Sequence, residues 1–367
     1  MIYFDYNASF PIRQSIKESI HDYLNVFGNP SSVHFFGRMA RKMIEESREK
    51  IAHILNVPLK TVIFTSGATE SNNTILKGFE GPVILSAQEH DSVFLARKDA
   101  LFYGVTMDGL VDLNHLENIL KETPPPFLVS IMSAHNETGV IQPLDDAFEL
   151  VKKYGGSIHV DAVQSLGRQS ITDWARFDYI TFSGHKIGAL KGAGVMVIKE
   201  NASFNPFTVG GGQERSFRAG TENVLSITTM GLAFDEAYHE DWQNSLKARD
   251  YIQETLLKEH DFVFVVGKNV ARLSNTLLIS MPYVKSETQV MNFDIHKIAV
   301  SAGSACSSGK VKVSKTLKAM NLDLSIAETM LRMSLPPNPL KEDVDMFLDV
   351  WKSIFNTCYL TKEDLKT

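Results

Sequence analysis

The sequence has few cysteines and no long apolar run. Cys306 and Cys358 are the two cysteines among 367 residues. That is too few for a disulfide scaffold or a cysteine-ligated zinc site, so a reducing compartment is expected. No stretch approaches the ~20 apolar residues of a membrane-spanning helix. Residues 2–5 lack the basic-then-apolar order of a secretory signal and the arginine and serine richness of a transit peptide. We therefore expect a cytoplasmic protein.

Basic residues are also fewer than acidic residues. The chain has 37 lysines and arginines against 43 aspartates and glutamates, a formal net charge of −6. Because binding of nucleic acid by counterion release needs a basic surface, we expect no direct binding to DNA. The hydrophobic share of 44% and the charged share of 22% are typical of an ordinary globular protein. The length suffices for one large and one smaller domain.

Helical and strand patterns alternate through much of the chain. An amphipathic helix is predicted after Pro11, with apolar positions at Ile12, Ile16, Ile20, Leu24 and Phe27. Further helices are predicted over residues 40–55 and over residues 144–153. This order predicts an α/β fold with a mainly parallel sheet, whose ligand sites lie at the carboxyl ends of the strands. The predicted strands are Thr61–Thr65, Pro82–Ser86, Phe127–Met132, Ser157–Val160, Tyr179–Ser183 and Gly194–Ile198.

The pattern changes from about Trp242, where a polar helix leads into shorter apolar runs and a glycine- and serine-rich stretch. We assign residues 14–241 to a large domain, and residues 1–13 and 242–367 to a smaller one.

Two polar side chains follow predicted strands and could bind a cofactor. Lys186 ends the sequence Ser183-Gly184-His185-Lys186, and a partly desolvated amine at a strand end can bind a carbonyl group covalently. A solvated lysine on a loop is the alternative. Asp161 follows another strand, where a carboxylate could pair with a pyridinium nitrogen. The alternative is an N-cap of a helix that begins near Ala162.

Two further segments also come after strands. Residues 65–70, Thr-Ser-Gly-Ala-Thr-Glu, join a strand to a predicted helix, and such a turn can bind a phosphate through its backbone N–H groups. The same sequence is also common in turns without a ligand, and it lacks the Gly-Lys-Ser/Thr ending of a Walker loop. His90 could stack on an aromatic cofactor and carry protons, or it could be an ordinary polar residue.

Cys306 lies in a stretch of small residues, 301–309, which can bury little apolar area. We therefore expect this segment to be mobile and exposed. Lys310, Lys312 and Lys315 follow and favour the thiolate, so a reactive thiol is predicted. Cys358, on the closing helix, is interpreted as a packing residue.

These segments, in this order, resemble the cysteine desulfurase family, within the class V aminotransferases of fold-type I pyridoxal-phosphate enzymes. The resemblance covers nearly the whole chain. It rests on Asp5–Ala8, Gly28–Ser32, Thr65–Asn72, Glu89-His90, Asn136–Gly139, His159–Ser165, Ser183–Lys186, Gly210–Arg215, Arg218–Asn223, Ser301–Gly309 and Leu331–Leu335.

The resemblance implies a fold and a reaction. The fold is a large domain with a mainly parallel, seven-stranded type of sheet, and a smaller α+β C-terminal domain. The reaction converts L-cysteine to L-alanine, with the sulfur held as a persulfide on Cys306, for iron–sulfur cluster assembly or another acceptor. Cys306 could also be a transient iron–sulfur ligand, and no other metal site is expected. The alternatives are a selenocysteine lyase, a class V aminotransferase and a catalytically silent binding subunit.

The resemblance also implies residue roles. Lys186 is similar to the Schiff-base lysine, Asp161 to the partner of the pyridinium nitrogen, and Gln164 to a donor to the ring hydroxyl. His90 is similar to the stacking acid/base, and Asn136 and Arg332 to the residues that receive the substrate carboxylate. The phosphate-binding residues are Ala68, Thr69, Ser183 and His185, with Thr221 from the other subunit of a homodimer.

Three positions depart from the family pattern. Ser9-Phe10 replaces a pair of threonines, and His135 stands where many relatives carry asparagine. Pro336-Pro337 follows the arginine motif where glycine or a small residue is commoner, which could shift Arg332, so the sequence leaves the effect on the Arg332 site open.

Overall fold

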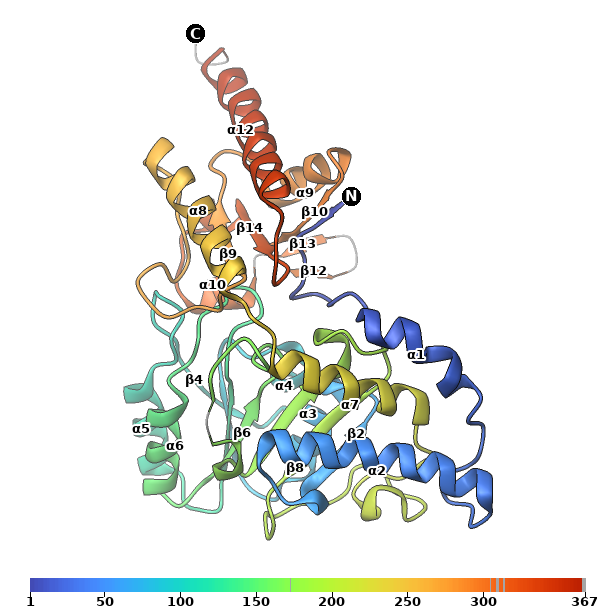
Figure 1. Ribbon diagram of the computed structural model, residues 1–367. Coiled ribbons are helices and arrows are strands. Elements are labelled where there is room, and N and C mark those ends of the chain that lie inside the picture. The colour runs from blue at the N-terminus through green and yellow to red at the C-terminus, as the bar shows by residue number, and fades with distance from the viewer. Residues whose placement is uncertain (172, 304, 308–309, 313, 365–367) are drawn as a thin grey trace.

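The structure is a computed structural model, shown in Figure 1. It describes residues 1–171, 173–303, 305–307, 310–312 and 314–364. Of these, the side chains of residues 305–307, 310–312 and 359–364 are not described. None of the described helices combines the length and apolar character that crossing a membrane requires.

A seven-stranded sheet forms the centre of the larger part of the chain, in the order β2-β8-β7-β6-β5-β3-β4. Strands β3 to β7 pair in parallel, whereas β8 is antiparallel to both of its neighbours. The predicted α/β fold with a mainly parallel sheet is confirmed. The strands are β2 (Val62–Thr65), β3 (Val83–Ser86), β4 (Leu101–Tyr103), β5 (Leu128–Met132), β6 (Ser157–Asp161), β7 (Tyr179–Ser183) and β8 (Gly194–Ile198).

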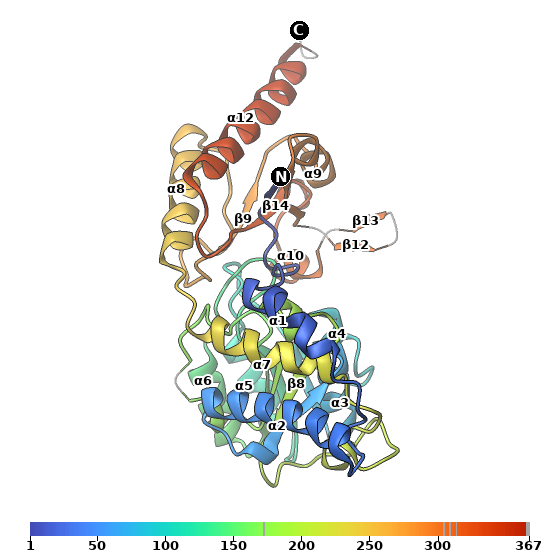
Figure 2. The same ribbon diagram turned by 45° about the vertical axis from the view of Figure 1, so that its right-hand side comes forward.

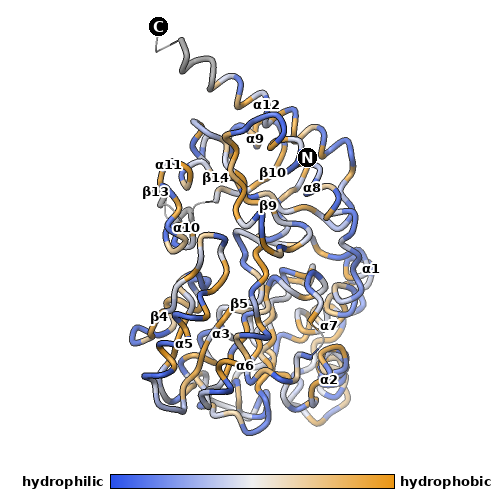
Figure 3. Tube along the Cα trace, turned by 90° about the vertical axis from the view of Figure 1, so that its left-hand side faces the viewer, coloured by the Kyte–Doolittle hydropathy of each residue, from blue (hydrophilic) through white to orange (hydrophobic). Residues whose placement is uncertain are grey.

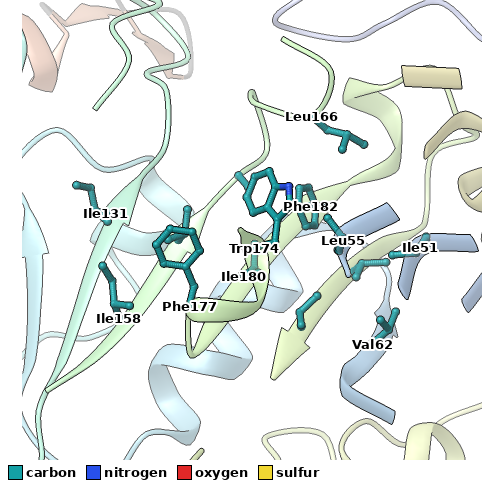
Figure 4. Packing of buried hydrophobic residues seen from close by; sticks show 14 of the residues in the cluster. Ile51, Leu55, Val62, Ile131, Ile158, Leu166, Trp174, Phe177, Ile180 and Phe182 are labelled. Carbon is teal, nitrogen blue, oxygen red and sulfur yellow. The ribbon is translucent and has the colours of Figure 1, made fainter. Parts of the chain in front are cut away.

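Helices cover both faces of this sheet, which explains why most strands are apolar at every position. One face packs against α2, α5, α6 and α7, and the other packs against α3. Figure 4 shows Ile51 and Leu55 of α2 beside Val62, with Phe182 and Trp174 farther along the same layer. The helices are α1 (Gln14–Leu24), α2 (Phe35–Leu55), α3 (Ala68–Gly78), α4 (Asp91–Phe94), α5 (Leu113–Glu122), α6 (Leu144–Lys153) and α7 (Val224–Tyr238).

Two of these helices show how local sequence determines their limits. His34 caps the start of α2 by accepting a hydrogen bond from the backbone N–H of Gly37. Asn56 ends α2 in the left-handed conformation that asparagine tolerates. The helix predicted after Pro11 is present as α1, but of its apolar residues only Ile16 is buried. Leu24, the last residue of α1, and Phe27, beyond its end, are exposed.

The C-terminal part, together with the first residues, has a hydrophobic core of its own. Ile2 and Phe4 pack in this core with buried hydrophobic residues that lie between Ile252 and Phe355 in the sequence. The rings of Phe293 and Phe347 stack there with centroids 5.0 Å apart. Cys358 packs against the same core, as predicted. Its elements are α8 (Gln243–Glu259), β9 (Thr276–Ser280), α9 (Ser286–Ile295), β11 (Ser301–Ala302), α10 (Lys315–Ala319), α11 (Leu324–Ala327), β14 (Met330–Ser334), α12 (Lys341–Asp364), and β1 (Ile2–Tyr3) paired with β10 (Ile298–Ala299).

Figures 1 and 3 show this part above the seven-stranded sheet, with hydrophobic residues running through the interior of both parts. The proposed domain limits at residues 13 and 241 stay a prediction.

The backbone of Cys306 lies in a short hairpin. Strand β12 (Ala305–Ser307) pairs antiparallel with β13 (Lys310–Lys312), and Cys306 is opposite Val311. Figure 2 shows these two strands to one side of β14 and α10. The predicted exposure and mobility of the Cys306 side chain lie outside the described residues.

Candidate active site

A cavity of about 540 Å³ lies where the carboxyl ends of β6 and β7 meet the start of α3 and the side of β14. This is the location that parallel sheets favour for ligands. Thr221 is not among its lining residues, and the side chain of Cys306 lies outside the described residues. The predicted residues that line it are Ala68, Thr69, His90, Asn136, Asp161, Gln164, Ser183, His185, Lys186 and Arg332.

Lys186 enters the cavity from a short 3-10 turn that follows β7. Its ammonium group donates hydrogen bonds to the backbone oxygens of Asn7 at 2.6 Å and Ala8 at 3.0 Å. Burial, together with the nearby guanidinium groups of Arg332 and Arg168, lowers the pKa of Lys186 to about 8. A substantial fraction of the amine is therefore neutral and nucleophilic near pH 7.

Asp161 ends β6 and is almost completely buried. One carboxylate oxygen accepts a hydrogen bond from the side chain of Asn72 at 2.8 Å, and the other accepts one from the backbone N–H of Val163 at 3.1 Å. Burial raises the pKa of Asp161, because the charged form loses its water. The segment after Ala162 forms turns and no helix, so the helix N-cap alternative is wrong. A cationic ring nitrogen in the cavity would supply the partner that a buried carboxylate needs.

The start of α3 offers backbone donors to an anion. Its N-cap is Gly67, which has no side chain to occupy the first N–H groups, and a Cβ at this position would have no described atom within 4 Å. Free N–H groups and the positive end of the helix dipole favour a phosphate at Ala68 and Thr69. The nearby Glu70 is paired with Arg218 at 2.8 Å, so its negative charge is balanced.

His90 caps α4 through its own ring. Its Nδ1 accepts a hydrogen bond from the backbone N–H of Ser92 at 3.1 Å and lies 2.8 Å from the hydroxyl of the same residue. Burial lowers the pKa of His90, although the negative charge of Asp161 opposes that effect. The ring is therefore neutral near pH 7, with its proton on Nε2.

Arg332 reaches the cavity from β14, and its guanidinium is only partly engaged. One Nη donates to Asp5 at 2.7 Å and the other to the backbone oxygen of Asn136 at 3.1 Å. Its Nε–H is buried and has no hydrogen-bond partner among the described residues. Strand β14 pairs with β9 as far as Ser334, before Pro336, and Arg332 lines the cavity.

Several polar residues of the site were not predicted as functional. Arg168 donates to the amide oxygen of Gln164 at 2.8 Å and to the backbone oxygen of Lys186 at 3.2 Å. The amide nitrogen of Gln164 donates to the backbone oxygen of Asn7 at 3.0 Å. Asn7 and Asn72 lie inside motifs that the sequence indicated, but their contacts join positions far apart in the chain.

The donor set fits a phosphorylated aromatic aldehyde that is positively charged on its ring. An amine, a buried acid, an uncapped helix start and an unpartnered guanidinium N–H line the same cavity. Together they can bind an aldehyde, a ring nitrogen, a phosphate and a substrate carboxylate.

Comparison with known proteins identifies close relatives. A family model, Aminotransferase class-V, matches residues 2–347. Cysteine desulfurase IscS of Dictyoglomus turgidum is 36% identical over 372 aligned positions, which cover 96% of this chain and 94% of that protein. Among solved structures, a NifS-like protein from Rickettsia africae has a TM-score of 0.89 at 35% identity, covering 97% of this chain and 99% of the other. SspA in complex with cysteine has a TM-score of 0.79 at 28% identity, and the match covers 93% of this chain and 100% of that chain.

Proposed function

The chain belongs to the cysteine desulfurases of the class-V aminotransferase family, and on this premise we propose that its cavity converts L-cysteine to L-alanine and passes the sulfur to Cys306 as a persulfide. The predicted fold type and the predicted enzyme class are confirmed by these relatives. The roles of single residues are proposed from their places in the cavity.

Pyridoxal 5′-phosphate is the cofactor of this family, and we propose that four residues bind its ring. Lys186 provides the amine for the aldehyde, Asp161 the acid for the ring nitrogen, and Gln164 a donor to the ring hydroxyl. His90 stacks on the ring. When bound, the cofactor withdraws electrons from the α-carbon of an amino acid.

The phosphate is assigned to the start of α3 and to the end of β7. Ala68 and Thr69 offer backbone donors, and Ser183 and His185 offer side chains in the same cavity. We also propose a homodimer in which the partner subunit's Thr221 binds this phosphate. Support comes from the exposure of Thr221 and from its position outside the cavity of its own chain.

The substrate carboxylate is proposed to bind Arg332 and the side chain of Asn136. The unpartnered Nε–H of Arg332 is a ready donor, and a guanidinium suits a carboxylate in a bidentate contact. Because this contact holds the amino acid by one end, it also orients the α-proton and the sulfur toward the chain's reactive groups.

Three side chains then act on the substrate. The neutral amine of Lys186 takes the α-proton onto Nζ. The Cys306 thiolate attacks the sulfur of the substrate, so that an S–S bond forms, the C–S bond breaks, and the electrons of the broken bond stay with the carbon. His90 gives a proton to the β-carbon from which the sulfur has left, and Lys186 returns the proton on its Nζ to the α-carbon, so the product leaves as alanine. The persulfide then passes its outer sulfur to an acceptor, for which an iron–sulfur scaffold protein in the cytoplasm is proposed.

The observation that carries this proposal is the presence of Lys186 and Asp161 in the lining of one cavity, Asp161 at the end of β6 and Lys186 in the turn that follows β7. The test replaces Cys306 with serine and measures both cofactor absorption and sulfur release from cysteine in the presence of a thiol. We expect absorption to persist and sulfur release to stop. Cys358→Ser is the matched control, and it should retain full activity. Full activity of Cys306→Ser would refute the assignment of the nucleophile.

A further inference from the structure

Three residues shortly after the Cys306 hairpin contact the chain neighbours of two cavity-lining residues, His90 and Asn136. We name Ser314, Lys315 and Thr316 the anchor segment. Ser314 caps α10, because its hydroxyl accepts a hydrogen bond from the backbone N–H of Thr316 at 3.1 Å. Ser314 and Thr316 are buried, at 1% and 2% exposure, although the segment joins a hairpin to a helix. Such burial of polar groups requires partners.

The first set of partners comes from the two residues on either side of Asn136. The hydroxyl of Ser314 donates to Glu137 at 2.6 Å, and Nε2 of His135 lies 2.9 Å from the hydroxyl of Thr316. Nδ1 of His135 accepts hydrogen bonds from two backbone N–H groups, so its proton is on Nε2. His135 is completely buried, and its Nε2–H is shared between the hydroxyl of Thr316 and the backbone oxygen of Gln88, which lies 3.1 Å away.

The second set of partners comes from the two residues on either side of His90. The ammonium group of Lys315 donates to the backbone oxygen of Glu89 at 3.0 Å and to the carboxylate of Asp91 at 2.6 Å. It also lies 3.9 Å from the centre of the Phe94 ring. Lys315 is therefore held by three groups of the short segment 89–94, which includes α4.

Binding residues and anchoring residues thus alternate along both loops. Glu89 and Asp91 enclose His90, and His135 and Glu137 enclose Asn136, so each loop presents one side chain to the substrate and its neighbours to the anchor segment. From this arrangement we propose that Glu137 and His135 are positioning residues, which fix the base of the Cys306 hairpin relative to the bound substrate. The inference rests on the proposed function of Cys306.

This positioning role should affect one step of the reaction, the attack of the Cys306 thiol on the substrate sulfur. Loss of the hydrogen bonds between the anchor segment and residues 135 and 137 leaves Lys186, Asp161 and Arg332 in place, so substrate binding should persist. The thiol, in contrast, would meet the substrate sulfur less often in the correct geometry, and a displacement of about 1 Å can slow a reaction on the order of a hundredfold.

The test uses the full-length protein loaded with cofactor and follows two events in a single turnover with L-cysteine. One is the change in cofactor absorption on substrate binding, and the other is persulfide formation on Cys306, measured by mass spectrometry. In Glu137→Ala and in Thr316→Val we expect the absorption change at its normal rate, and persulfide formation slowed roughly ten- to a hundredfold. Glu137→Gln keeps an oxygen that accepts from Ser314, and it should form persulfide at nearly the parent rate.

Lys318→Ala is the matched control, because Lys318 is exposed on the same helix and should not affect either event. If the parent protein forms persulfide and both Glu137→Ala and Thr316→Val do so at the parent rate, the inference is overturned while the proposed function stands. An equal slowing of both events would also overturn it, since that is the result of general structural damage. If the parent protein forms no persulfide, the proposed function itself fails.

Discussion

The pKa of Lys186 is a property that the structure predicts and that can be measured without cofactor. Burial and the neighbouring guanidinium groups lower this pKa to about 8, from an ordinary value of 10.5. At pH 7 roughly 10% of the amine would be neutral, against roughly 0.03% for an ordinary lysine, which is a gain of about 300-fold in reactive amine.

The perturbation is a change of pH, and the assay is competitive acylation of the cofactor-free protein. Brief exposure to a small amine-specific reagent at a series of pH values, followed by mass spectrometry of the Lys186 peptide, gives the midpoint of its reactivity. We expect a plateau above about pH 8 to 9, with an exposed lysine such as Lys42 as an internal standard for the reagent. Arg332→Met removes a cation that lowers the pKa of Lys186, and it should move the midpoint upward.

The same shift has a consequence for folding. Between about pH 8 and 10.5 the unfolded chain holds a proton on Lys186 that the folded chain has lost, so the contribution of this group to stability rises with pH across that window. A reactivity midpoint near 10.5, unchanged in Arg332→Met, would refute this account of the amine.

Three further variants test other parts of the structure. Replacing Asp161 with alanine removes the acid proposed for the ring nitrogen. Because one hydrogen bond to a charged group is lost, the variant should release cofactor during dialysis roughly 10- to 100-fold faster than the parent protein. Release at the parent rate would contradict the assignment. Arg332→Lys keeps the charge but loses the planar fork, so KM for L-cysteine should rise by about tenfold or more while the cofactor stays bound; an unchanged KM would place the carboxylate elsewhere. Glu214→Ala removes the buried ion-pair partner of the Arg48 guanidinium at 2.8 Å and leaves it with the less buried Glu45 at 3.1 Å, so urea unfolding should show a loss of about 3 kcal/mol; a loss under about 1 kcal/mol would mean that the pair with Glu214 contributes little.

Local sequence patterns predicted the strands of the sheet well, because strands buried on both faces are apolar throughout. The direction of β8 relative to β7 could not be predicted in that way, because an apolar run looks the same in a parallel and in an antiparallel strand. The connection from β7 is short, which suits the antiparallel pairing observed. Strand β4 was missed because it has three residues and both Leu101 and Phe102 are exposed.

The site residues show the same contrast between what local sequence predicts and what it does not. Lys186, Asp161 and His90 follow strands, and strand ends in a parallel sheet meet, so these residues could be predicted from position. The bonds from Arg332 to Asp5 and from Gln164 to Asn7 could not, because side-chain contacts between distant segments depend on how those segments pack in the folded chain. The anchoring role of His135 and Glu137 likewise depends on contacts with residues 314 and 316.

The most direct test of the central claim is a single turnover of the cofactor-loaded protein with L-cysteine and no added thiol, followed by mass spectrometry of the Cys306 peptide and by alanine analysis. The account predicts one additional sulfur atom on Cys306 and one alanine for each turnover. Alanine formed while Cys306 remains unmodified, or no alanine at all, would contradict it.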